Sequence, residues 1–119
     1  MILYWCETDD HDEDWFLVAP SARKACRIHE DQEGYGRGDA RATVVCRIPK
    51  HLTTTVGWPD HALLKALGAV FLSEQTPRIV KISGKIYQEG GMDGVLNRLT
   101  DDVHEALGEG RPHGTTKLM

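Results

Sequence analysis

Residues 2–19 read ILYWCETDDHDEDWFLVA, and this stretch decides the fold. It contains two apolar, aromatic runs, Ile2–Glu7 and Trp15–Ala19, whose side chains suit a pleated sheet. The residues between them, 8–14, are all polar. The stretch therefore predicts a β-hairpin with an acidic tip.

A helix is predicted directly after the hairpin. Pro20 ends the second run, Ser21 is a good N-cap, and Gly34 is a good C-cap. Small side chains recur at helical spacing on one side of this segment, which indicates close packing on a sheet. These residues are Ala22, Ala25, Cys26 and His29.

The pattern changes to alternation over residues 41–48, which predicts a half-buried strand ended by Pro49. One face of that strand would carry Ala42, Val44, Cys46 and Ile48. A short helix is expected between Pro59 and Gly68, followed by strands over 69–73, 78–82 and 85–89. Ser83-Gly84 is a plausible hairpin turn between the last two strands.

The last predicted element is an amphipathic helix over residues 92–107, whose apolar residues follow the i, i+3, i+4, i+7 rule. The element order is thus ββαβ-α-βββ-α, with three helices. Strands joined by short turns favour a mainly antiparallel sheet with the helices on one face, an α+β domain over residues 1–108. The polar, Gly- and Pro-containing tail 109–119 is expected to be flexible.

Length and composition narrow the class of protein. A chain of 119 residues and 13.3 kDa corresponds to one domain. No apolar run approaches the roughly 20 residues that cross a bilayer, and the N-terminus lacks the pattern of a signal peptide. We therefore expect a cytoplasmic protein without membrane contact. Three cysteines do not make a disulfide framework.

Charge is the most informative bulk property. The formal net charge is −4, yet residues 1–14 hold six acidic residues and neither lysine nor arginine. The rest of the chain is nearly neutral, and the pI of about 5.8 disfavours direct binding to nucleic acid. The negative charge is thus concentrated at the acidic tip, and the rest of the chain is nearly neutral.

The leading functional hypothesis is a small non-enzymatic regulatory protein, inhibitor-like or antitoxin-like, that docks on the basic surface of a protein partner. Charge at the tip would steer association, and an exposed tryptophan (Trp5, Trp15 or Trp58) would anchor it. Trp58 could equally pack on the helix that follows it. The hypothesis needs no cofactor and no metal, and a homo-oligomer paired through edge strands is a further option. The predicted binding residues are Asp9, Asp10, Asp12, Glu13, Asp14 and Trp58.

Two metal-dependent alternatives remain open. Carboxylates and an imidazole could form the centre of a metal-dependent phosphoesterase or nuclease. That centre would use Asp10, Asp12, Asp14, His29 and Asp31. Cys26 and His29 form a C-x-x-H pair that Cys6 or Cys46 could complete as a zinc site, although core packing explains these thiols more simply. No nucleophile–base signature is present.

Overall fold

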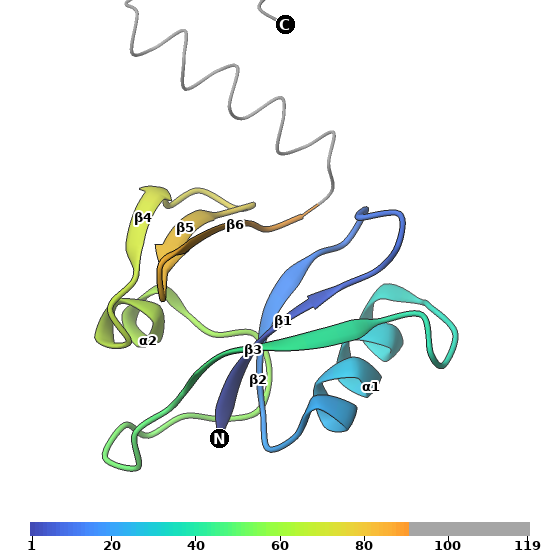
Figure 1. Cartoon of the computed structure of the whole chain (residues 1–119), viewed down its shortest axis with the longest axis horizontal. Coiled ribbons are helices and arrows are strands. Elements are labelled where there is room, and N and C mark those ends of the chain that lie inside the picture. Colours follow the sequence, from blue (N-terminus) through green and yellow to red (C-terminus); the bar gives the residue numbers. More distant parts are fainter. Residues whose placement is uncertain (91–119) are drawn as a thin grey trace, which may run out of the picture.

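The computed structural model describes residues 1–90. Its elements follow one another as β1 (Ile2–Glu7), β2 (Trp15–Ala19), α1 (Ala22–Glu33), β3 (Arg41–Arg47), α2 (His61–Ala66), β4 (Val70–Ser73), β5 (Ile79–Ile82) and β6 (Lys85–Gln88) (Figure 1). Neither helix in this part of the chain is long and apolar enough to cross a membrane. The predicted third helix, 92–107, and the tail, 109–119, lie outside the described residues.

The strands form two antiparallel three-stranded sheets, an N-terminal sheet in the order β2-β1-β3 and a second sheet in the order β4-β5-β6. The α+β class and the antiparallel pairing are confirmed. The prediction of one sheet with all helices on one face is wrong. Loop 48–60 and α2 carry the chain from β3 to the opposite face of the N-terminal sheet, where the second sheet forms (Figure 1).

The β1–β2 hairpin is buried on both faces, which explains why both strands are apolar throughout. Its register runs from Ile2 opposite Ala19 to Cys6 opposite Trp15. One face, which includes Tyr4, Cys6, Leu17 and Ala19, packs against α1. The other face packs against α2 and the second sheet; its residues are Leu3, Trp5, Phe16 and Val18. The molecule therefore has three layers.

β3 departs from the predicted alternation. A bulge shifts its register, so that Tyr4 lies opposite Val44 while Leu3 lies opposite Cys46. A one-residue shift moves the following side chains to the other face of the sheet. Ala42 therefore packs on the α1 side and Cys46 on the opposite side, while Val44 is exposed.

The predicted caps of the first helix and the predicted hairpin turn at Ser83-Gly84 are confirmed. The Ser21 hydroxyl oxygen accepts a hydrogen bond from the Lys24 N–H at the start of α1, and Gly34 ends the helix with φ of 79°. Ser83 and Gly84 both have positive φ, 52° and 80°, as a tight hairpin turn between β5 and β6 requires. α2 begins at His61, two residues after Pro59, which was predicted to lie in its first turn, and Asp60 is its N-cap.

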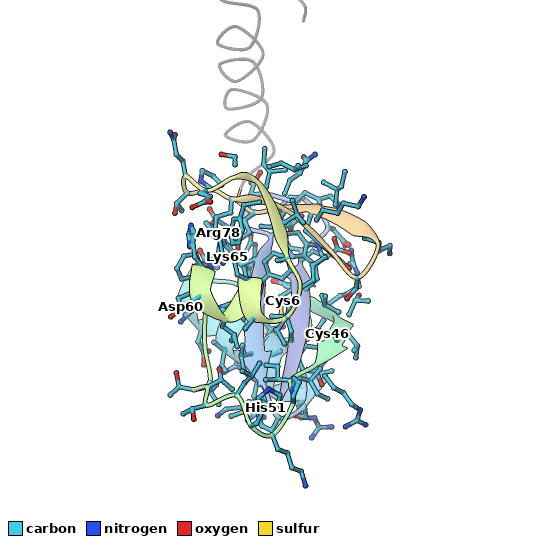
Figure 2. The ribbon with its side chains drawn as sticks, turned by 90° about the vertical axis from the view of Figure 1, so that its left-hand side faces the viewer. Cys6, Cys46, His51, Asp60, Lys65 and Arg78 are labelled. Carbon is cyan, nitrogen blue, oxygen red and sulfur yellow. The ribbon has the colours of Figure 1, made fainter. Side chains whose placement is uncertain are left out.

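A buried ion pair lies at the open end of the β5–β6 hairpin and is bonded to β2 through Glu89. The Arg78 guanidinium donates to both oxygens of Glu89, at 2.7 and 3.0 Å, and both side chains are fully buried. Glu89 also accepts from the Phe16 N–H on β2 and from the Trp58 indole N–H. The Trp58 ring lies 3.9 Å from the guanidinium carbon, and His61 Nδ1 accepts from the same arginine. Figure 2 shows Arg78 beside α2, between the layers.

Gly90 lies at the same junction, which is the contact between β2 and the second half of the chain. Its backbone forms a pair of hydrogen bonds with Asp14, and Gly57 forms the equivalent pair with Val18. Together with the bond from Phe16 to Glu89, these contacts use the N–H groups of three alternate residues, Asp14, Phe16 and Val18. The outer edge of β2 is thus tied to the second half of the chain, which protects it from pairing with another chain.

Gly90→Ala is expected to destabilise the protein more than Gly84→Ala. Both glycines have positive φ, which costs an L-residue about 1–2 kcal/mol. A Cβ at Gly90 would also lie 2.7 Å from Pro77 Cγ, whereas nothing lies within 4 Å at Gly84. The overpacking adds about 1–3 kcal/mol. Urea unfolding of both variants measures the difference; equal losses would contradict the close approach at Gly90.

Glu89→Gln should cost about 3–5 kcal/mol of unfolding free energy, because it leaves the buried Arg78 charge without a counter-ion. Gln retains an acceptor for the Phe16 and Trp58 N–H groups. Adding Arg78→Met removes the stranded charge, so the double variant should lose less than the sum of the single losses. Additive losses in a double-mutant cycle would show that the pair is not coupled.

Candidate functional site

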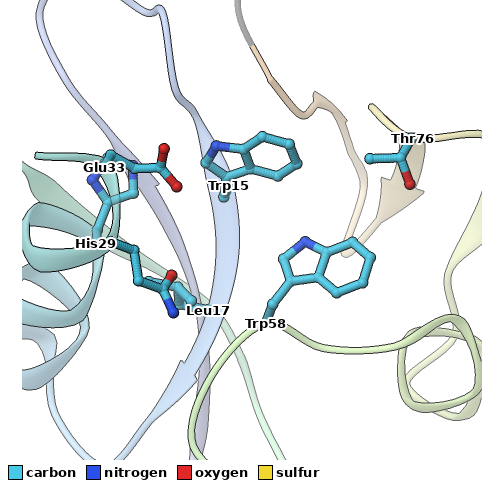
Figure 3. A pocket seen from close by; sticks show the side chains of 7 residues that line it. Trp15, Leu17, His29, Glu33, Trp58 and Thr76 are labelled. Carbon is cyan, nitrogen blue, oxygen red and sulfur yellow. The ribbon is translucent and has the colours of Figure 1, made fainter.

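A pocket of about 430 Å³ opens where the hairpin, α1 and the loop before α2 meet. This volume lies within the range of roughly 300–1,000 Å³ typical of ligand sites. Tryptophan rings come from both sides of the junction, Trp15 from β2 and Trp58 from the loop, with polar groups of α1 beside them (Figure 3). The lining residues are Trp15, Leu17, His29, Gln32, Glu33, Trp58 and Thr76.

The two tryptophans are held by carboxylates. The Trp15 indole N–H donates to Glu13 Oε1 at 3.0 Å, and the Trp58 indole N–H donates to Glu89 Oε2 at 3.0 Å. Because both N–H groups are already bonded, the rings can offer a ligand only their π-faces and edges. Trp58 is 43% exposed although one ring face lies on Arg78. It is therefore both packed and accessible.

His29 connects α1 to the hairpin tip. Its Nε2 contacts the Glu13 carbonyl oxygen, which can only accept, so Nε2 carries the proton. The ring stacks on Tyr35, with centroids 5.9 Å apart. His29 is 1% exposed, and its buried Nδ1 has no hydrogen-bond partner among the described residues. This contact fixes the backbone of Glu13, and with it the carboxylate that holds Trp15.

Negative charge accumulates at the α1 side of the pocket. Burial raises the pKa of the Glu33 carboxyl group, and the charge of Glu13 raises it further. Figure 3 shows the Glu33 carboxylate pointing toward the Trp15 ring. Within residues 1–90 neither Glu13 nor Glu33 forms an ion pair with a lysine or arginine. Glu33 on the pocket wall and Glu13 beside it are therefore carboxyl groups that no lysine or arginine of residues 1–90 neutralises.

Some carboxylates of the tip are bonded to neighbouring residues of the protein. Asp9 forms an ion pair with Arg41. Asp10 accepts from the Thr8 hydroxyl at 2.6 Å, the Asp12 N–H at 3.0 Å and Tyr35, and the Thr8 bond is the main reason that the pKa of Asp10 is lowered. Of the predicted binding residues, Asp9, Asp10 and Asp12 are exposed, Glu13 lies beside the pocket and Trp58 lines it.

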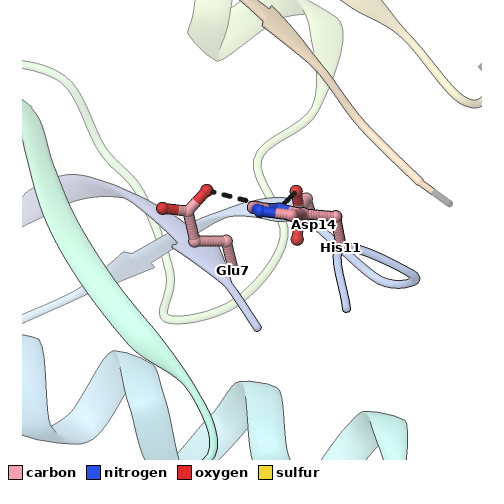
Figure 4. Close-up of side chains that lie close together, drawn as sticks. All are labelled: Glu7, His11 and Asp14. Carbon is pink, nitrogen blue, oxygen red and sulfur yellow. Dashed lines mark hydrogen bonds and ion pairs between the residues drawn. The ribbon is translucent and has the colours of Figure 1, made fainter. Parts of the chain in front are cut away.

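The sixth predicted binding residue, Asp14, points inward. It is 7% exposed, and its Oδ2 lies 2.8 Å from His11 Nδ1, which also lies 3.7 Å from Glu7 Oε1 (Figure 4). Glu7, His11 and Asp14 form a group of three possible metal ligands within 4.8 Å. Here one imidazole nitrogen faces both carboxylates, so the imidazolium can itself balance their charge.

The residues proposed for a metal-dependent hydrolase are not gathered in this way. Of that set, only Asp14 belongs to a group of three donors found within residues 1–90. His29 Nε2 is used by Glu13, and Asp31 pairs with Arg37 at 2.8 Å. These positions bring together no centre that could hold a metal and a substrate.

No cysteine within residues 1–90 belongs to a group of three possible metal ligands. Cys6 packs on the α1 side of the N-terminal sheet, whereas Cys46 packs on the opposite side (Figure 2). Cys6, Cys26 and Cys46 are all free thiols. Burial raises the pKa of Cys6 to about 12, so the metal-binding thiolate is disfavoured.

The sequence identified Trp58 but missed most of the pocket. Trp5, one of the suggested anchors, is buried against Phe16 and Tyr87. Glu33 was unremarkable in the sequence; its position in the last turn of α1, without a nearby basic residue, is the only local signal. No protein-family model, curated protein or solved structure matches this chain.

The pKa of His11 should lie above 6.5, because the imidazolium donates to Asp14. A raised folded-state pKa stabilises the protein below the unfolded pKa, and this contribution is lost as pH rises through the folded value. NMR titration of His11 should therefore show a lower pKa in Asp14→Asn. Glu7→Gln is the matched control, with a smaller effect because Glu7 is more distant. Equal effects would contradict the direct bond.

Proposed function

We propose that this chain is a non-enzymatic binding protein that docks on the basic surface of a protein partner through one acidic end of the molecule. The acidic end comprises the hairpin loop, residues 7–14, and the end of α1 with the loop after it, residues 30–39. Contacts from Glu13 to His29 and from Asp10 to Tyr35 hold these two segments together.

The observation that carries the proposal is the imbalance of charge at this end around an aromatic pocket. The acidic end contains ten acidic side chains, and the two arginines 37 and 41 are the only lysines or arginines packed with them in the described part of the chain. Trp15 and Trp58 line the pocket beside it. Charge complementarity and aromatic anchors are the usual components of a docking surface for a basic protein.

Stability alone does not account for these acids. The last turn of α1 contains Glu30, Asp31 and Glu33 and no basic residue, although carboxylates are disfavoured at the C-terminal end of a helix. Glu30 serves the fold, because it accepts from the Gly38 and Ala40 N–H groups. Glu33 makes no such contact, and a role outside the domain would explain it.

Association with a basic peptide should depend on the exposed charge of the tip. An arginine-rich peptide should bind faster at low salt, and Asp12→Asn should slow association about 2-fold there, since each removed charge weakens steering. Stopped-flow tryptophan fluorescence measures the rate. The control is Glu74→Gln, which removes an exposed charge from the loop after β4.

Two results would contradict the proposal. The first is equal association rates for Asp12→Asn and Glu74→Gln across a range of salt concentrations. The second is equal binding of the arginine-rich peptide and of its counterpart with glutamate at every arginine position. Either result would show that the negative end does not select the partner.

A further inference from the structure

Within the protein, the side chain of Arg78 is bound by a tryptophan and a carboxylate. Arg78 lies over the ring of Trp58, while its guanidinium donates in fork geometry to Glu89. The same carboxylate accepts the indole N–H of Trp58. One carboxylate thus holds both the ring and the cation, an arrangement in which the guanidinium gains stacking and two charge-assisted hydrogen bonds at once.

Half of this arrangement is repeated on the other wall of the pocket. The Trp15 indole N–H donates to the Glu13 carboxylate, as the Trp58 N–H does to Glu89. Glu33 provides a second carboxyl group, pointing toward the Trp15 ring (Figure 3). Within residues 1–90 no arginine or lysine lies over Trp15 or pairs with Glu13 or Glu33. In this part of the chain the tryptophan and the carboxylates are thus present without a cation.

Space and support for a ligand are also present. The pocket has room for a long side chain, at about 430 Å³, and it is lined by Leu17 as well as by the rings. The contact from His29 to the Glu13 carbonyl holds the carboxylate wall in place. The raised pKa of Glu33 shows that its negative charge is unfavourable in the unliganded pocket, and a bound cation would relieve this.

We infer that the pocket between Trp15 and Trp58 receives an arginine side chain of the partner protein, with its guanidinium over the Trp15 ring and bound by Glu13 and Glu33. This inference rests on the proposed function, because it names the residue by which the basic partner is recognised. A planar guanidinium fits better than a lysine ammonium, since it can stack on an indole and donate to two carboxyl groups simultaneously.

The test uses the full chain and a short capped peptide with a single arginine, compared with the same peptide carrying lysine or citrulline at that position. The indole N–H resonances of the three tryptophans are followed by NMR. The arginine peptide should shift the Trp15 resonance and leave buried Trp5 unchanged. The lysine peptide should bind more weakly, and the citrulline peptide should not bind measurably.

Glu33→Gln and Glu74→Gln are the matched variants. Each replaces one glutamate by glutamine, but Glu33 lines the pocket, whereas Glu74 lies outside the acidic end and pairs with Lys65. Glu33→Gln should weaken binding of the arginine peptide about 10-fold, the loss expected for a charge-assisted hydrogen bond. Glu74→Gln should change affinity less than about 2-fold.

Equal affinities of the two variants, an unshifted Trp15 resonance, or equal binding of the arginine and lysine peptides would each overturn the inference. The first two results leave the proposed function standing if an arginine-rich peptide still associates in a salt-dependent way. If no basic peptide binds at all, both the inference and the proposed function fail. Because Glu33 is a surface residue on α1, loss of folding does not confuse the comparison; circular dichroism checks this.

Discussion

The ion pair between Arg78 and Glu89 is the constraint on which the rest of the structure depends. Burying two charges is expensive, and a pair of this kind is retained where its geometry specifies one arrangement. Here the carboxylate of Glu89 satisfies an N–H of β2 and the indole of Trp58 as well as the arginine. A shift of the second sheet along β2 would separate this carboxylate from the Phe16 N–H, so the bond at Phe16 favours one alignment of the two sheets.

The pocket is a consequence of that alignment. Trp15 belongs to the first sheet, whereas Trp58 is held by the ion pair of the second, so the distance between their rings is set by the junction. The acidic hairpin is tied to α1 by His29 and to the second sheet by Gly90. Aromatic surface and negative charge therefore lie on a rigid support, which lowers the entropic cost of ordering a binding surface.

Local elements were predictable because their causes are local. Two apolar runs around a polar loop specify the β1–β2 hairpin, and Ser21 and Gly34 bound α1 through bonds within a few residues. The face of β3 was not predictable, because its bulge depends on how the strand aligns with β1. Likewise Asp14 resembles its acidic neighbours in the sequence, yet pairing with Gly90 and His11 turns it inward.

The sequence by itself determined the α+β class, the hairpin, the capped helix and the local excess of acid at the tip, since each follows from residues close together in the chain. Only the tertiary structure decided that the strands divide into two sheets, that Glu89 meets Phe16 and Trp58, and that Glu33 lines one pocket with Trp15 and Trp58 while Glu13 lies beside it. The physical reason is that packing between sheets and the buried bonds of Glu89 to Phe16 and Trp58 join residues distant in sequence, and no local propensity encodes such a partner.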